Sequence, residues 1–109
     1  MPPRDFSIRI RDILRACEKI LAHTKDMSFE TFADDEWTQD AVIRNLTVIG
    51  EAARHIPKAV ADRYSEVPWA DIRDMRNIVV HEYFGVDLKV IWKTISEDIP
   101  DLYRRLVDR

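Results

Sequence analysis

Three side chains that could do chemistry stand within eight residues of one apolar segment. The segment runs from Arg76 to Tyr83, with His81 between them. Arginine is a permanent cation whose planar fork of N–H donors fits phosphate oxygens. Histidine, with a reference pKa of roughly 6.5, can take or give a proton near neutral pH. An arginine and a histidine together can therefore cleave a phosphodiester without a metal.

The spacing of these residues resembles a known family motif. Arg76, His81 and Tyr83 form the pattern Arg-x4-His-x-Tyr, which is similar to that of the HEPN superfamily, specifically the HepT-like toxins encoded beside a minimal nucleotidyltransferase antitoxin. Two more stretches resemble this family: residues 39–53, which are similar to its long central helix, and residues 68–77. The likeness runs from about the first helix to residue 95 and covers most of the chain.

This resemblance implies a role for each residue of the motif. His81 would act as general base on the ribose 2′-OH, or as acid on the 5′-oxygen leaving group. Arg76 would stabilise charge on the phosphorus oxygens, and Asn77 would support Arg76 or the phosphate. In the family the nucleotidyltransferase transfers AMP from ATP to the tyrosine, which implies that Tyr83 is the acceptor. We therefore expect a metal-independent endoribonuclease toxin that needs no cofactor and is neutralised by that antitoxin.

Each of these residues also has an ordinary structural interpretation. The stem of Arg76 could cover apolar surface while its head reaches water. His81 could bond the last carbonyls of its helix, and Tyr83 could be a packed aromatic with a solvated hydroxyl. The alternative function is a non-catalytic subunit that docks the nucleotidyltransferase and serves as its substrate. A purely structural helical dimerisation domain is a third hypothesis.

The helical spacing separates the two catalytic candidates. His81 follows Arg76 by five positions, which places it about 140° further round an ideal helix. Either the helix loosens before Gly85, or a second subunit completes the site across a two-fold axis. The family resemblance favours the second route, because it implies a dimer in which the two copies of the motif lie beside one cleft. We therefore expect a homodimer.

Composition indicates one soluble globular domain over residues 1–109. Hydrophobic residues make up 46% of the chain and charged residues 34%, as in ordinary folded proteins. The single cysteine, Cys17, excludes an intramolecular disulfide and fits a reducing compartment. No stretch resembles a signal core or a membrane span, so we expect a cytoplasmic protein with no membrane partner. The net charge of −3 argues against generic nucleic-acid binding, so RNA would have to be attracted by a local site.

Metal and nucleotide sites are not expected. His23, His55 and His81 are far apart, and the chain has no His-x3-His or Cys-x2-Cys pattern. It also lacks a glycine-rich phosphate loop that could bind ATP. Cys17 lies on the apolar stripe of the first predicted helix, which favours a buried, inert thiol over a nucleophile.

Apolar periodicity predicts an all-α fold. Short helices are expected at 28–34, capped by Ser28, and at 57–64. The four main helices are expected at residues 5–25, at 36–56, from Pro68 to Gly85, and from Asp87 onward, with Asp87 as the cap and a kink at Pro100. An up-and-down bundle of the HEPN kind follows.

The core face of the 36–56 helix is formed by Val42, Leu46, Ile49, Ala53 and Ile56, and Trp37, Ala41 and Val48 add a second apolar flank. So broad an apolar arc indicates neighbours on two sides, in a bundle centre or at a subunit interface. Asn45 is expected as a buried amide on the core face, and Glu51 falls on the polar side.

Overall fold

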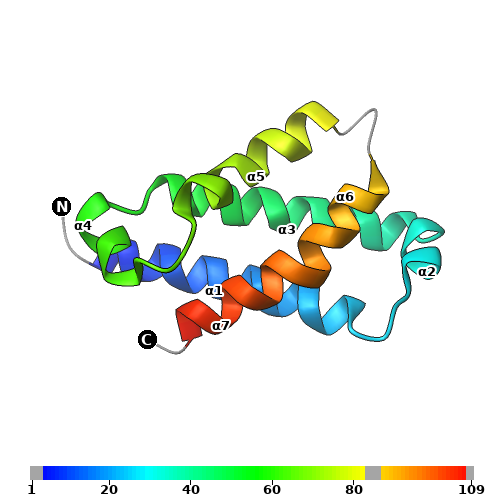
Figure 1. Cartoon of the computed structure of the whole chain (residues 1–109), viewed down its shortest axis with the longest axis horizontal. Helices are drawn as coiled ribbons and strands as arrows, with labels where there is room; N and C mark the ends of the chain where they lie inside the picture. The colour runs from blue at the N-terminus through cyan, green and yellow to red at the C-terminus, as the bar shows by residue number, and fades with distance from the viewer. Residues whose placement is uncertain (1–3, 83–86, 108–109) are drawn as a thin grey trace.

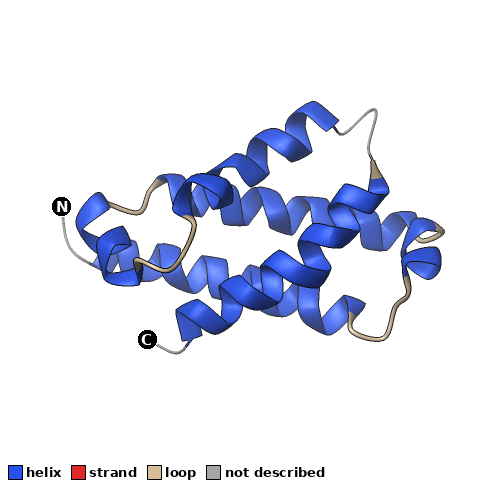
Figure 2. Cartoon of the chain, in the orientation of Figure 1, coloured by secondary structure: helices blue, strands red, loops and turns tan. Residues whose placement is uncertain are grey.

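The bundle has four long helical segments. The computed structural model describes residues 4–82 and 87–107, and describes side chains over 8–76 and 87–107. Within these residues the secondary structure is helical, with no strand (Figure 2). The segments alternate in direction (Figure 1): α1 (Arg4–Thr24), α3 (Glu36–Arg54), α5 (Trp69–Glu82), and a run of α6 (Leu88–Lys93), η2 (Thr94–Asp98) and α7 (Ile99–Val107). The predicted all-α, up-and-down fold class is confirmed.

The long helix α3 lies at the centre of the bundle. It packs against α1 on one side and α5 on another, while α7 packs against α1. The core face predicted for the 36–56 helix is buried: Val42, Leu46, Ile49 and Ala53 lie on α3, and Ile56 lies just beyond its end. They join one continuous apolar core with residues of α1, α5, α6 and α7. Burial of these faces against one another is what holds α3 and α5 side by side.

Side-chain caps set where the helices begin. Ser28 and Thr31 form a reciprocal capping box at the start of α2 (Phe29–Ala33). Asp35 accepts a hydrogen bond from the Thr38 backbone N–H at 3.0 Å and so starts α3. Asp87 accepts one from the Lys89 N–H at 3.0 Å and starts α6. The predicted caps at Ser28 and Asp87 are confirmed.

The C-terminal helical run adapts to a proline without breaking. Pro100 has no N–H to give to a preceding carbonyl, and its ring crowds the turn before it. The turn before it, Thr94–Asp98, widens to π-helical geometry, and the Ile99 N–H donates to the Thr94 carbonyl. The apolar stripe stays in phase, since Ile95, Ile99 and Leu102 are all buried. The prediction of one helix that continues through Pro100 is therefore confirmed. The described irregularity is the π turn before the proline, where the prediction had a kink at Pro100.

The connection between α3 and α5 differs in detail from its prediction. Instead of one short helix it contains α4 (Lys58–Ala61) and a 3₁₀ turn, η1 (Asp62–Tyr64). Pro57 is the N-cap of α4, in extended conformation, and not its first helical residue. Within the described residues, no helix is both long and apolar enough to cross a membrane. The helix predicted from Pro68 was expected to end at Gly85, which lies outside the described residues.

Candidate active site around Arg76

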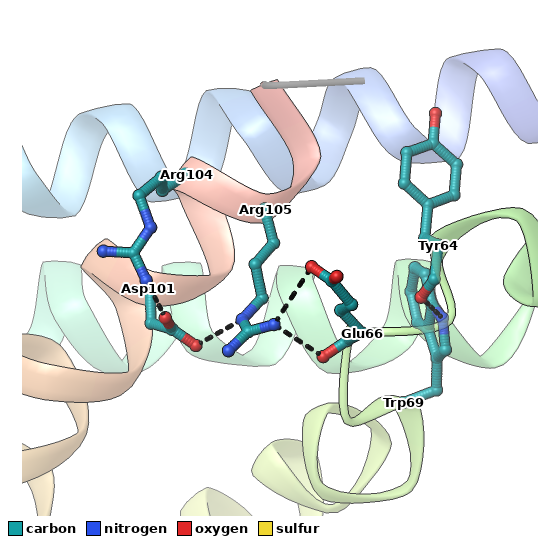
Figure 3. Close-up of polar contacts among 6 residues, drawn as sticks. All are labelled: Tyr64, Glu66, Trp69, Asp101, Arg104 and Arg105. Atoms are coloured by element: carbon teal, nitrogen blue, oxygen red, sulfur yellow. Dashed lines mark hydrogen bonds and ion pairs between the residues drawn. The ribbon is translucent and has the colours of Figure 1, made fainter.

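The start of α5 is anchored by a buried tryptophan. The indole N–H of Trp69, the first residue of α5, donates to the carbonyl oxygens of Ala61 at 3.1 Å and Tyr64 at 3.2 Å. Figure 3 shows the indole lying against the turn that carries Tyr64. The ring is buried, so its one polar atom is satisfied by the preceding turn. These two hydrogen bonds fix the N-terminal end of α5, the helix that carries Arg76.

A second anchor joins the same segment to α7. The Arg105 guanidinium donates from Nε to Asp101 at 2.8 Å and from Nη1 to the Glu66 carbonyl oxygen at 3.2 Å (Figure 3). Arg104 also pairs with Asp101. The hydrogen bond from Arg105 holds the pKa of the Asp101 carboxyl below its ordinary value. The loop before α5 is thereby tied to the last helix.

Helices α3 and α5 meet closely at Gly50. A Cβ at position 50 would lie 2.8 Å from the backbone nitrogen of Arg76 and 2.9 Å from its Cβ. Real Cβ atoms do not approach other atoms that closely, so the contact requires glycine. One turn earlier on α5, Arg73 Nε donates to the Ala53 carbonyl oxygen at 3.4 Å. The backbone of Arg76 therefore lies directly against α3.

This close approach brings Arg76 to an acidic partner. Its Nε lies 2.5 Å from Oε1 of Glu51, the residue after Gly50. The same carboxylate oxygen accepts a hydrogen bond from Nη1 of Arg54 at 3.4 Å. The Arg76 side chain is 39% exposed and that of Glu51 is 43% exposed. Arg76 is thus a surface cation held from its Nε side by a carboxylate of the neighbouring helix.

The placement of Arg76 fits anion binding. The predicted alternatives for it were a solvated head with a stem on apolar surface, or a partnered charge. Its half-exposed side chain follows buried Met75 and pairs with Glu51, so the guanidinium is both partnered and open to water. A guanidinium in this state can receive a phosphate through its Nη groups.

The other motif residues are placed only by their backbone, or not at all. Asn77 and His81 belong to α5, but their side chains lie outside the described ones. Tyr83 lies outside the described residues altogether. Because α5 continues as an α-helix through Glu82, the backbone positions of Arg76 and His81 remain about 140° apart round its axis. The helix does not loosen between these two residues. Completion of the site by a second subunit, the other expected route, stays a prediction.

Two other features of the chain lie apart from Arg76. Cys17 is fully buried, and burial, with a smaller contribution from Glu18, raises the pKa of its thiol to about 12. The predicted burial of this thiol is confirmed. A surface cavity of about 300 Å³ opens between the end of α1 and the α6–η2 segment, and its lining includes neither α3 nor α5: Leu21, Thr24, Lys25, Met27, Trp92, Ile95 and Ser96.

The sequence interpretation missed the contact between Glu51 and Arg76. It placed Glu51 on the polar side of α3 without a partner, because a single sequence does not show which helix lies beside which. One signal was available: Gly50 is an isolated glycine inside a long helical pattern, and such a glycine often marks close backbone approach. The neighbour of a helix-contact glycine is well placed to reach the facing helix.

Comparison with known proteins finds similarity over most of the chain. The model of a family described as "Ribonuclease HepT-like" matches residues 13–108. A protein of Thermococcus cleftensis named "Probable ribonuclease HepT" is 46% identical over 93 residues, covering 85% of this chain and 84% of the relative. A protein of Caldanaerobacter subterraneus subsp. tengcongensis, by its name a suspected RNase, is 40% identical over 104 residues, covering 95% of this chain and 90% of the relative. No solved structure matches the chain.

Proposed function

Because this chain belongs to the HepT-like ribonuclease family, we propose that it is the endoribonuclease toxin of a toxin–antitoxin pair. The observation that carries the proposal is the state of Arg76: a partially exposed guanidinium, held by Glu51, at the head of the Arg-x4-His spacing. The N–H donors of such a cation fit the oxygens of a phosphate. A partner-binding surface alone would give no reason to hold this arginine in place.

The proposed chemistry is cleavage of RNA by attack of the 2′-OH. His81 takes the proton from the 2′-oxygen or gives one to the departing 5′-oxygen. Arg76 stabilises the charge that builds on the phosphorus oxygens, and Asn77 supports it. The products are a 2′,3′-cyclic phosphate end and a free 5′-hydroxyl. The arginine supplies the positive charge that a metal supplies in other nucleases, so the reaction is proposed to be metal-independent.

The proposed active form is a homodimer. Within the described residues, two members of the second apolar flank of α3 stay exposed: Trp37, which is 87% exposed, and Ala41. Val48 on the same flank packs partly against the core. A large exposed aromatic in such a flank favours an interface. Glu51, fourteen positions after Trp37, lies on the same face of α3. A second copy on this face would therefore lie beside Arg76, where it could bring its own His81.

Neutralisation is proposed to occur at Tyr83. A nucleotidyltransferase antitoxin would transfer AMP from ATP to the tyrosine hydroxyl and release pyrophosphate. Tyr83 follows Arg76 by seven positions in the sequence, which is two turns of a helix. The ester would place a phosphate and a nucleoside near the cation that otherwise binds the substrate phosphate.

Three substitutions test this proposal. His81→Ala and Arg76→Ala should each lower RNA cleavage by about a hundredfold or more. Tyr83→Phe keeps the ring but removes the acceptor oxygen, so it should leave cleavage intact and abolish AMP transfer. Cells expressing Tyr83→Phe should stay poisoned when the antitoxin is present. The readouts are growth on expression, cleavage of single-stranded RNA, and transfer of labelled AMP.

One result would replace the nuclease with the docking subunit. In that case wild type and His81→Ala would be equally harmless and equally inert on RNA, while Tyr83 would still accept AMP. Glu30→Gln, at an exposed position of α2, serves as the control for expression and folding.

A further inference from the structure

We propose that Glu51 is the positioning residue of Arg76: its carboxylate holds the guanidinium from the Nε side so that the two Nη groups face the scissile phosphate. The inference deepens the proposed function and rests on it for the identity of the substrate. Glu51 would not touch RNA itself. It acts through the arginine, from a different helix.

The geometry shows why the carboxylate reaches this arginine. Gly50 lets the α3 backbone approach Arg76 so closely that even one added carbon would clash. Glu51 follows directly and spans the remaining gap, with Oε1 2.5 Å from Nε. Among the described residues it is the one ion-pair partner of Arg76. The pair therefore depends on helix packing and not on two flexible side chains meeting in solvent.

The use of Nε makes the ion pair compatible with phosphate binding. A guanidinium has five N–H donors, one on Nε and four on the two Nη groups. A carboxylate at Nε leaves the Nη groups, which carry most of the donors, for two oxygens of a phosphate. Half-exposure of both side chains provides the access that a substrate needs. Glu51 is thus placed as an orienting group and not as a competitor for the phosphate site.

Orientation of the arginine matters for rate more than for substrate binding. An exposed arginine explores many rotamers, and fixing it beforehand removes that entropy cost from the transition state. Any cation near the phosphate attracts RNA, whereas stabilising the charge that develops on particular oxygens needs a fixed fork. Loss of Glu51 should therefore lower kcat by about tenfold and change KM little.

A double-mutant cycle separates positioning from a general structural role. Glu51→Ala should lower single-turnover cleavage of a short RNA about tenfold when Arg76 is present, and less than twofold when it is added to Arg76→Ala. Glu51→Asp keeps the charge on a shorter stem and should recover part of the loss. Asp40→Ala removes the same charge from an exposed position of α3 and should have no effect.

A second measurement examines the same contact without any cleavage. The Nε–H of Arg76 should give an ordered NMR signal, assigned by its disappearance in Arg76→Lys. Glu51→Gln should lower the order parameter of that Nε, and Asp40→Asn should leave it unchanged. This readout decides the proposal even if no RNA is cleaved, so its outcome is distinct from the outcome for the nuclease itself.

Three results would overturn the inference. The first is an equal loss from Glu51→Ala in both Arg76 backgrounds, which would indicate a structural role. The second is faster cleavage by Glu51→Ala, which would make the carboxylate an inhibitor. The third is an Arg76 Nε that is equally mobile with and without Glu51.

Discussion

At the scale of single residues, the local sequence predicts chemistry better than it predicts partners. The types and spacing of Arg76 and His81, together with the family resemblance around them, predict phosphodiester chemistry. The sequence cannot show that Glu51 holds Arg76, since 25 positions separate them and their contact depends on the packing of two helices. Asn45 shows the same limit: expected as a buried amide on the core face, it is half-buried and donates to the Ala41 carbonyl of its own helix at 2.8 Å.

Cys17 gives a prediction at this scale. Burial raises the pKa of its thiol from 9.0 to about 12, so the native protein holds the proton at pH values where an unfolded chain has lost it. The buried, protonated thiol therefore makes its full contribution to the free energy of unfolding below pH 9, and this contribution is lost as pH rises from 9 toward 12. At pH 8.5, iodoacetamide should label the native protein far more slowly than the urea-unfolded chain. Labelling at the rate of a free thiol in the native protein would contradict the burial.

At the scale of helices, apolar periodicity and caps locate nearly every element. Ser28 and Asp87 were identifiable as caps, because a short acceptor side chain before an apolar run is a local signal. The π turn at Thr94–Asp98 was less accessible. Pro100 predicts that the helix is irregular at this point. Whether it breaks, kinks or widens depends on which geometry keeps Ile95 and Ile99 in the core. The sequence therefore predicts where an element changes more readily than how it changes.

Gly50→Ala tests the helix contact that carries the site. Replacing glycine by alanine inside a helix normally stabilises it by about 1 kcal/mol. Here the new Cβ would meet the backbone of Arg76, and overpacking of this kind typically costs about 1–3 kcal/mol. We expect net destabilisation in urea unfolding, together with slower RNA cleavage as α5 moves away from Glu51.

An internal calibration accompanies that substitution. Comparing Asp40→Gly with Asp40→Ala measures the glycine-to-alanine difference at an exposed position of the same helix. The contradicting outcome is that Gly50→Ala raises the free energy of unfolding by the full difference between Asp40→Ala and Asp40→Gly. That result would show that α3 and α5 do not approach closely at residue 50.

At the scale of the whole molecule, packing within the bundle accounts for only part of the apolar surface of the central helix α3. The broad apolar arc predicted for α3 is accounted for on one face by packing against α1 and α5. On the second flank, Trp37 and Ala41 stay exposed within the described residues. Sequence alone could not divide the arc between internal neighbours and a partner copy, because both bury the same kinds of side chain.

Trp37→Asp tests whether a second copy covers that flank. A charge in place of the exposed ring should disfavour an apolar interface, so the protein should change from dimer to monomer in light scattering at micromolar concentration. Val90→Asp is the matched control, because Val90 is also an exposed apolar residue but lies on α6. A wild-type protein that is already monomeric and well folded would exclude the proposed dimer.

The proposal that Arg76 and His81 cleave RNA without a metal is tested most directly by cleavage of a single-stranded RNA in excess EDTA. We expect unchanged cleavage in the chelator, with products that carry 2′,3′-cyclic phosphate and 5′-hydroxyl ends. DNA of the same sequence should not be cleaved, and His81→Ala should be inactive. Activity that disappears in EDTA and returns with Mg²⁺, or that persists fully in His81→Ala, would contradict the proposal.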